Sequence, residues 1–146
     1  MGAPPFLNYA AMVASPPMFN WRRPTNLGLK DGRLAPCKRT PNCVSSQAEA
    51  QDREHQIAPI AFRGSMAELR RAVESMPRAT VIRAEPNYLY AEFRTPLMRY
   101  VDDVELYYDE RAGLVQVRSA SRLGRRDFGV NRRRVEELRA LIQARR

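Results

Sequence analysis

Residues 118–134 read RSASRLGRRDFGVNRRR. The residues before this stretch alternate between apolar and polar, and those after it recur with helical spacing, so it should carry the chain from a strand through a loop into a helix. Seven arginines against a single aspartate make it strongly cationic. The segment is therefore the junction of the predicted fold and the first place to look for a binding site.

The helix after the loop is expected to begin with Asn131 as its N-cap, because an asparagine side chain accepts hydrogen bonds from the first turn. An apolar stripe follows at Val135, Leu138, Leu141 and Ile142. This spacing predicts that one side of the helix packs on a core.

Four segments show the period-two pattern of strands: residues 79–84, 88–94, 102–109 and 114–119. In the second of them Leu89, Ala91 and Phe93 share one face, while tyrosines and charged residues share the other. Residues 85–87 and 109–113 are suited to turns between strands. We expect an antiparallel meander with one buried and one polar face.

A strand and a helix are predicted before the meander. Residues 56–62 are a short apolar run that we interpret as a first strand, with Pro59 indicating an edge or a bulge. Ser65 and Glu68 have the spacing of a capping box, which predicts a helix, and Pro77 prevents that helix from continuing. Its predicted buried stripe is Leu69, Ala72, Val73 and Met76.

Together these elements predict an α+β fold, a two-layer sandwich in which two helices cover one face of an antiparallel meander of about four to five strands. Seven of the eleven prolines lie in residues 1–46, which we therefore expect to be coil. We divide the chain into a Pro-rich N-terminal extension, residues 1–26, and a single α+β domain, residues 27–146.

The composition fits one soluble domain, with 146 residues of which 44% are hydrophobic and 28% charged. No apolar run is long enough to span a bilayer, and no basic residue precedes the first apolar run, as it would in a secretory signal. The sequence as it stands therefore favours the cytoplasm. The formal net charge of +9 is uneven, because residues 118–146 carry ten arginines against three acidic residues.

Cys37 and Cys43 are the only cysteines, and both lie in the predicted coil. Two interpretations stay open: a disulfide, which would indicate an oxidising compartment, and a pair of plain thiols. A tetrahedral metal site would need further ligands, and His55 is the only histidine. We therefore expect no metal site, and the sequence indicates no cofactor.

Several short blocks occur in an order that resembles a known family: residues 32–34 (GRL), 36–37 (PC), 41–46 (PNCVSS), 102–105 (DDVE), 118–122 (RSASR) and 127–132 (DFGVNR). On these blocks the chain resembles the domain of unknown function 1499 family from residue 27 to residue 143. The resemblance implies no reaction, because the family has none assigned. Similar proteins occur in bacteria and plastids, some behind export or membrane segments, which makes the periplasm or the plastid lumen the second choice of compartment.

The strand order also predicts which charges meet. When residues 109–113 close an antiparallel pair, the start of its first strand lies opposite the end of its second, so Asp102 and Asp103 should lie near residues 118–121. Three arginines in the first turn of the last helix oppose its macrodipole, so a negative group is expected there too. One hypothesis is an internal ion-pair network in which Asp102, Asp103 and Asp127 support the arginines.

The functional hypothesis is an anion pocket, in which guanidinium, hydroxyl and amide groups hold a phosphate or a carboxylate. Its predicted members are Arg118, Ser119, Ser121, Arg122, Asn131 and Arg134. The domain would then bind a small anionic ligand or an acidic protein surface in a non-enzymatic or accessory role.

Two other functions are considered. A hydrolase could use Asp102 and Asp103, but neighbouring residues of a strand point to opposite faces, which argues against a catalytic pair. A weak nucleic-acid binder would fit the positive charge, yet no recognition motif accompanies it, and Tyr88, Tyr90 and Tyr107 fit packing against the coil as well as base stacking. The sequence leaves enzymatic activity open, disfavours nucleic acid as a partner and predicts no oligomeric state.

Overall fold

The structure, a computed structural model, describes residues 22–145. The strands are β1 (Cys43–Ser45), β2 (Ile60–Ala61), β3 (Ala79–Ala84), β4 (Tyr88–Arg94), β5 (Val101–Asp109) and β6 (Leu114–Ser121). The helices are α1 (Met66–Glu74) and α2 (Val130–Ala144). The chain therefore has an α+β fold, with its longest strands in the second half.

The strands form one antiparallel sheet in the order β1-β6-β5-β4-β3, and β2 also pairs with β6. Successive hairpins connect β3 to β6, which is the meander that the alternation predicts. The two short strands lie along the outer edge of β6, β1 near its end and β2 near its start. The three longest strands, β4, β5 and β6, are therefore hydrogen-bonded on both sides and lie inside the sheet.

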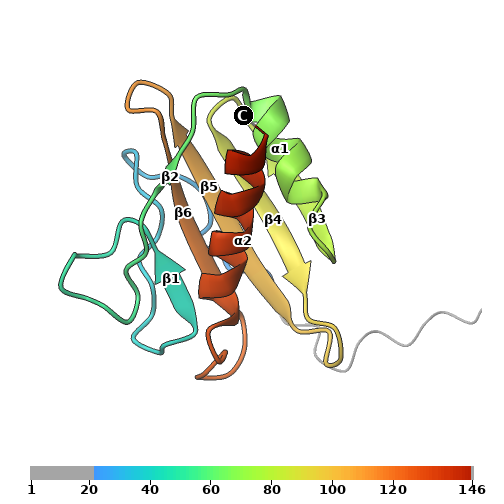
Figure 1. The fold of residues 1–146 in the computed structure, drawn as a ribbon. Helices are drawn as coiled ribbons and strands as arrows, with labels where there is room; N and C mark the ends of the chain where they lie inside the picture. The colour runs from blue at the N-terminus through green and yellow to red at the C-terminus, as the bar shows by residue number, and fades with distance from the viewer. Residues whose placement is uncertain (1–21, 146) are drawn as a thin grey trace, which may run out of the picture.

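Both helices lie on the same face of the sheet, as Figure 1 shows. They cover a core to which the sheet contributes the apolar positions of β4, β5 and β6 and α2 contributes Val135, Leu138 and Ile142. In α1 the buried residues are Leu69, Ala72 and Val73. The predicted two-layer sandwich is confirmed, and burial of these apolar side chains is its main source of stability.

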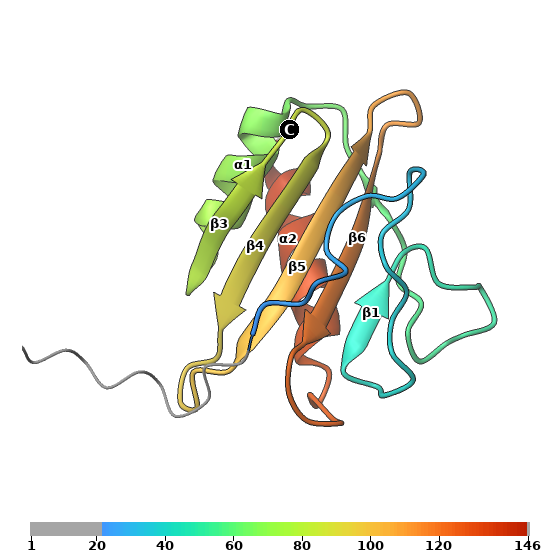
Figure 2. The same cartoon turned by 180° about the vertical axis from the view of Figure 1, so that it is seen from behind.

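The second face of the sheet is covered by the N-terminal coil, which crosses β5 and β6 in Figure 2. Leu34 packs there on Tyr88 and Tyr90, which are 0% and 3% exposed. The two tyrosines therefore pack against the coil and are not available for stacking on bases. The predicted polar face of the meander is polar in composition but buried.

Several predicted boundaries change. β1 lies in a region that was predicted to be coil, and only Ile60–Ala61 of the predicted strand 56–62 pairs with a neighbour, since Pro59 lacks the amide that a longer ladder needs. The last strand continues to Ser121 rather than ending at Ser119. The capping box at Ser65 is confirmed. The backbone amide of Glu68 donates to the Ser65 side chain, and the Glu68 carboxylate accepts from the backbone amide of Ser65.

The prediction of Asn131 as an N-cap is wrong. Gly129 is the N-cap of α2, with φ of +79°, a left-handed conformation that glycine adopts without steric cost. Asn131 is the second residue of the helix and is fully buried. Neither described helix has both the length and the apolar composition that crossing a bilayer requires.

Candidate anion-binding site

The predicted site residues of β6 divide between the two faces of the sheet, because side chains alternate along a strand. Arg118 and, one residue past the end of β6, Arg122 point toward the N-terminal coil, on the same face as their ion-pair partners Glu105 and Asp103. Ser119 and Ser121 point toward α2, where both contact Asn131. The residues predicted to form one pocket therefore lie in two separate clusters.

Arg122 is the centre of the cluster under the coil. Its guanidinium donates to both oxygens of Asp103 and to Oε1 of Glu92, with N–O distances between 2.8 and 3.2 Å. The hydroxyl of Tyr90 donates to Asp103 over 2.5 Å and accepts from Arg122 over 3.1 Å. Two carboxylates thus share one guanidinium in a part of the protein from which water is nearly excluded.

The hydrogen bonds and charges of this cluster shift the pKa values of Glu92 and Tyr90. Burial by itself would raise the pKa of Glu92, but hydrogen bonds from Arg23 and Arg122 outweigh it and hold that pKa below its ordinary value. Burial, together with the neighbouring Asp103, raises the pKa of the Tyr90 hydroxyl, so the phenol stays protonated. Arg23 closes the cluster from outside with a 2.7 Å ion pair to Glu92.

A second cluster on the same face is built around Glu105, which is 0% exposed. Its carboxylate accepts from the hydroxyl of Tyr88 over 2.7 Å and from the backbone amide of Gly28 over 2.8 Å. Gly28 has φ of +106°, a conformation that other residues rarely adopt, and this conformation turns its amide toward the sheet. The coil is therefore held on the sheet by a backbone-to-carboxylate hydrogen bond.

Arg118 lies beside this carboxylate, but the carboxylate accepts only one long hydrogen bond from its guanidinium. Its Nη1 is 3.5 Å from Oε2 of Glu105, which is longer than the ion pairs that Arg122 and Arg23 form on this face. Arg118 is only 5% exposed, and its buried Nε has no hydrogen-bond partner among the described residues. A buried guanidinium with an open donor position is costly unless something else accepts its hydrogen bond.

A hollow of about 400 Å³ opens beside Arg118, between the coil, the loop of Cys37 and Cys43, and the end of β6. We call it the Arg118 hollow. Its basic lining residues are Arg22, Lys38, Arg118 and Arg122, and its acidic one is Asp103. Because Asp103 already receives hydrogen bonds from Arg122, the remaining charge that faces the hollow is positive.

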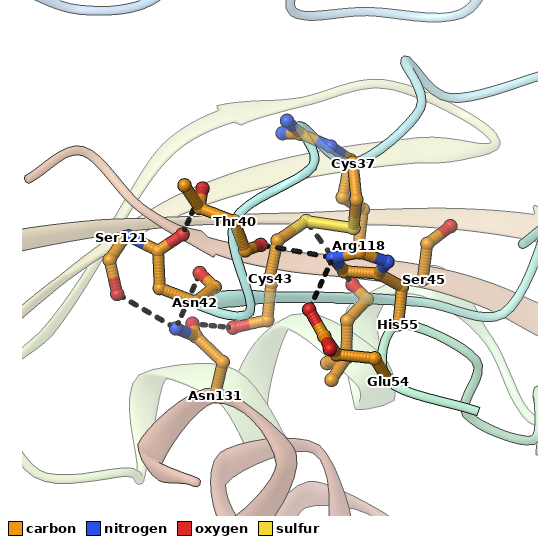
Figure 3. The surroundings of a disulfide bond; sticks show 12 residues. Cys37, Thr40, Asn42, Cys43, Ser45, Glu54, His55, Arg118, Ser121 and Asn131 are labelled. Atoms are coloured by element: carbon orange, nitrogen blue, oxygen red, sulfur yellow. Dashed lines mark hydrogen bonds and ion pairs between the residues drawn. A yellow bond between two sulfur atoms is a disulfide. The ribbon is translucent and has the colours of Figure 1, made fainter. Parts of the chain in front are cut away.

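Cys43 lines the hollow and forms a disulfide with Cys37, with an S–S distance of 2.05 Å. Figure 3 shows Arg118 beside it, as the pairing of Cys43 with Ala120 and of Ser45 with Arg118 requires. Of the two interpretations of these cysteines, the structure has the disulfide. Closing a loop this short stabilises the fold by about 2 kcal/mol in the chain-entropy description.

Asn131 is the centre of the cluster on the helix face. Its amide nitrogen donates to the carbonyl of Asn42 and to the Ser121 hydroxyl. Its amide oxygen accepts from the Ser119 hydroxyl and from Arg134, over 2.7 and 2.8 Å. One buried side chain therefore ties the start of α2 to the end of β6 and to the loop before β1.

Arg134 also forms a 2.6 Å ion pair with Asp102. Burial raises the pKa of Asp102 above its ordinary value, although the charge of Arg134 acts in the opposite direction.

At the helix start, Asp127 accepts hydrogen bonds from the backbone amides of Gly129 and Asn131. Burial opposes ionisation there, but these hydrogen bonds outweigh it and lower the pKa of Asp127. Asp127 is the negative group that the arginine-rich first turn predicts.

Asp102 and Asp103 are close to Ser121 and Ala120 respectively, as the antiparallel register predicts. They point to opposite faces, however, and each is paired with a different arginine. They therefore do not form a joint acid–base pair. Within residues 22–145, no group of three or more histidine, cysteine, aspartate or glutamate side chains is arranged to hold a metal ion.

His55 joins the disulfide loop to the segment before β2. Its Nδ1 lies 2.9 Å from Asp52 and its Nε2 lies 2.9 Å from the carbonyl of Thr40, as Figure 3 shows for the second contact. Both neighbours are acceptors, so only the doubly protonated ring can donate to both. Burial lowers the pKa of His55, but the Thr40 carbonyl and Asp52 outweigh it and raise the pKa above its ordinary value.

We expect the pH dependence of stability near neutrality to come from this ring. The pKa of His55 is higher in the folded than in the unfolded chain, so protonation of the ring stabilises the fold. This stabilisation is complete below the unfolded-state pKa of about 6.5 and is lost as the pH rises through the folded-state pKa. Urea unfolding at a series of pH values from about 6 to about 8 should show decreasing stability in the native chain. His55→Gln should remove most of that slope, and an equal slope in both proteins would contradict the assignment.

The comparisons with known proteins give one match. A family model described as a protein of unknown function, DUF1499, matches residues 33–142. The chain belongs to this family. No match was found among curated proteins or solved structures. The matched range of this DUF1499 domain contains both cysteines, Arg118 and Asn131, whereas Arg22, Arg23 and Gly28 lie before it.

Sequence reasoning missed several residues of the site in this DUF1499 protein. Glu105 and Glu92 were placed on the polar face of the meander but given no role, and Lys38 and Gly28 were treated as coil. The alternation of tyrosines with acids along β4 and β5 was the available signal, because a solvent-exposed face rarely needs three tyrosines. The contacts of Lys38 and Gly28 depend on how the coil folds back.

Proposed function

We propose that this domain binds a small anion, a phosphate or a carboxylate, in the Arg118 hollow, and that it acts by binding rather than by catalysis. The observation that carries the proposal is the open donor position of Arg118. Its buried Nε has no acceptor among the described residues, and its contact with Glu105 is long. An anionic oxygen in the hollow would supply the missing acceptor.

The charges around the hollow support an anion over a neutral ligand. Arg22 and Lys38 are exposed at its rim, and Asp103 is the single acid among the described lining residues. Arg122 already compensates that acid, so an incoming anion would meet a positive field. A planar guanidinium also matches the geometry of phosphate and carboxylate oxygens.

The size of the hollow limits the ligand. A volume of about 400 Å³ is near the lower end of ordinary small-molecule pockets, which favours a phosphorylated or carboxylated small molecule over a polymer. The ligand would contact the coil, the disulfide loop and β6 together. Binding should therefore also stabilise the coil on the sheet.

Titration calorimetry at low salt with inorganic phosphate, sugar phosphates and dicarboxylates tests the proposal. A bound ligand should lose about tenfold or more in affinity in Arg118→Gln, because a charge-assisted hydrogen bond is lost. Lys38→Ala should weaken binding by about threefold, as expected for a rim charge. Arg39→Ala removes an equal charge from the neighbouring residue, which does not line the hollow, and should bind as the native chain does.

Arg118→Gln also removes a buried ion pair, so its folding must be checked by circular dichroism before its affinity is interpreted. Lys38→Ala and Arg39→Ala change exposed side chains and should fold normally. Absence of binding by the native chain to all three ligand classes would reject the proposal. Equal weakening by Lys38→Ala and Arg39→Ala would show that the anion binds to diffuse surface charge instead.

A further inference from the structure

Large apolar side chains gather at one end of the domain. Among the described residues, the exposed large hydrophobic side chains are Ile82, Leu97, Met98 and Phe128. Leu97 and Phe128 are 93% and 87% exposed, and Met98 is 54% exposed. Leu97 and Met98 lie in the β4–β5 loop and Phe128 in the β6–α2 loop, which are at the same end of the sheet in Figure 1. We call this surface, residues 95–100 and 123–130, the loop end.

The first tip is a closed hairpin loop. The amide of Thr95 donates to the carbonyl of Tyr100, and the amide of Tyr100 donates to the Thr95 hydroxyl, both over 2.9 Å. Arg99 is in a left-handed conformation with φ of +52°. These constraints fix a four-residue tip on which Leu97 and Met98 face outward, so their exposure is built into the loop.

The second tip presents Phe128 in an unfavourable conformation. Its φ is +54°, which is uncommon for an aromatic residue, and its carbonyl accepts from Nη1 of Arg133 over 2.9 Å. The side chain of Asp127 holds the next amide, that of Gly129. Backbone strain of this kind persists where the surroundings enforce it, often at functional surfaces. Here it accompanies an aromatic ring that faces solvent.

The two tips flank one hollow of about 460 Å³, to which Thr95 and Tyr100 contribute from one loop and Leu123 and Phe128 from the other. The two loops therefore form a continuous surface. Leu97 and Met98 do not line that hollow, and Phe128 lines it but is 87% exposed, so these three side chains project from the loops instead of forming the walls of a groove. A groove would suit a helix or a strand of a partner protein, whereas projecting tips suit insertion into a soft, continuous phase.

The charged side chains of the loop end are nearly all basic. The exposed arginines on and beside it are Arg94, Arg99, Arg125, Arg126 and Arg133. The nearby acids are already engaged: Asp102 pairs with Arg134, and Asp127 caps α2. Glu137 is the exposed acid next to Arg133. Exposed arginines next to apolar tips are complementary to a surface that is negative at its boundary and apolar beneath it.

We infer that the loop end docks on an anionic lipid surface. Leu97, Met98 and Phe128 enter the boundary between headgroups and acyl chains, and the arginines contact lipid phosphates. The domain lies on the membrane without spanning it. The interaction combines buried apolar area with attraction to negative lipids, so both contributions are required for binding. It uses a different set of residues from the Arg118 hollow, because Ser121 is the one described residue that lines both hollows.

Co-sedimentation with vesicles tests this inference. The full chain should bind vesicles of phosphatidylcholine with phosphatidylglycerol, bind pure phosphatidylcholine far less, and be released as salt is raised. Leu97→Ser with Met98→Ser, and separately Phe128→Ser, should each reduce partitioning by about tenfold. Arg125→Ala with Arg126→Ala should reduce it by about 25-fold, at about fivefold for each charge.

Matched controls separate this surface from general properties of the chain. Ile82→Ser removes an exposed apolar side chain from edge strand β3, and Arg111→Ala removes an exposed charge from the hairpin at the opposite end of β5. Both should bind vesicles as the native chain does. No binding of the native chain to negative vesicles would overturn the inference. So would equal losses in the control variants, or concentration-dependent dimers that depend on Phe128 while vesicles are not bound.

Discussion

Arg122→Ala is expected to lower the free energy of unfolding by about 3–5 kcal/mol. The side chains of Arg122, Asp103 and Glu92 are 8%, 2% and 10% exposed. Removing the shared guanidinium leaves two carboxylates close together and short of compensation in a place that water barely reaches. Urea unfolding at neutral pH, followed by circular dichroism, measures the loss. Arg125→Ala removes an exposed charge of the same loop and should change stability by no more than about 0.5 kcal/mol.

The same variant has a predictable pH dependence. The folded-state pKa of Glu92 is lowered in the native chain, so its contribution is present above the unfolded-state pKa and is lost as the pH falls through the folded-state pKa. Arg23 also lowers this pKa, but Arg122→Ala removes both a hydrogen bond to Glu92 and a neighbouring positive charge. The stability difference between the two proteins should therefore be largest near neutrality and shrink in acid. A difference that is constant with pH would mean that Arg122 stabilises through packing alone.

Asn131→Ala should lower the free energy of unfolding by about 3 kcal/mol, because several buried polar groups lose a partner at once and each costs about 1–3 kcal/mol. Those groups are the Asn42 carbonyl, the hydroxyls of Ser119 and Ser121, and part of Arg134. Asn131 itself is 0% exposed, so water does not replace it without local opening. Thermal and urea unfolding measure the loss.

Two further variants test this explanation. Asn131→Asp keeps the shape but replaces the amide donor by an acceptor next to Asp127, so it should be at least as damaging at neutral pH and partly recover in acid. Ser121→Ala removes one hydrogen bond and should cost about 1 kcal/mol. An Asn131→Ala protein within about 1 kcal/mol of the native chain would show that the cluster is not a structural tie.

The two buried clusters differ in what they leave for a ligand. Around Asn131 the described donors and acceptors satisfy one another, so Ser119, Ser121, Asn131 and Arg134 are engaged in holding α2 on the sheet. Under the coil, Arg118 keeps an open donor position beside a hollow. The internal ion pairs lie on both faces of the sheet, Asp102 with Arg134 on the helix face and Asp103 with Arg122 under the coil. The anion hypothesis stays a proposal for the Arg118 hollow.

The elements that the sequence predicted well depend on local geometry. The alternation of β4 and β5, the capping box at Ser65 and the stripe on α2 depend on residues a few positions apart, whose side chains must share a face of a strand or helix. β1 was not predicted because its three residues are too few to show a period-two pattern. It is a strand because it pairs with the outer edge of β6. Gly129 displaced Asn131 as N-cap because Phe128 and Gly129 both turn left-handed.

By itself the sequence determined the α+β class, the meander, and the meeting of Asp102 and Asp103 with the end of β6, since a hairpin leaves little freedom in its register. The separation of the predicted site residues onto two faces, and the burial of Tyr88, Tyr90 and Glu105 under the coil, became visible in the folded chain. The contact of Gly28 with Glu105 joins residues 77 positions apart. The periodicity of a strand or helix predicts which face of it a side chain lies on. What covers that face depends on contacts with coil that is far away in the sequence, and periodicity does not predict those contacts.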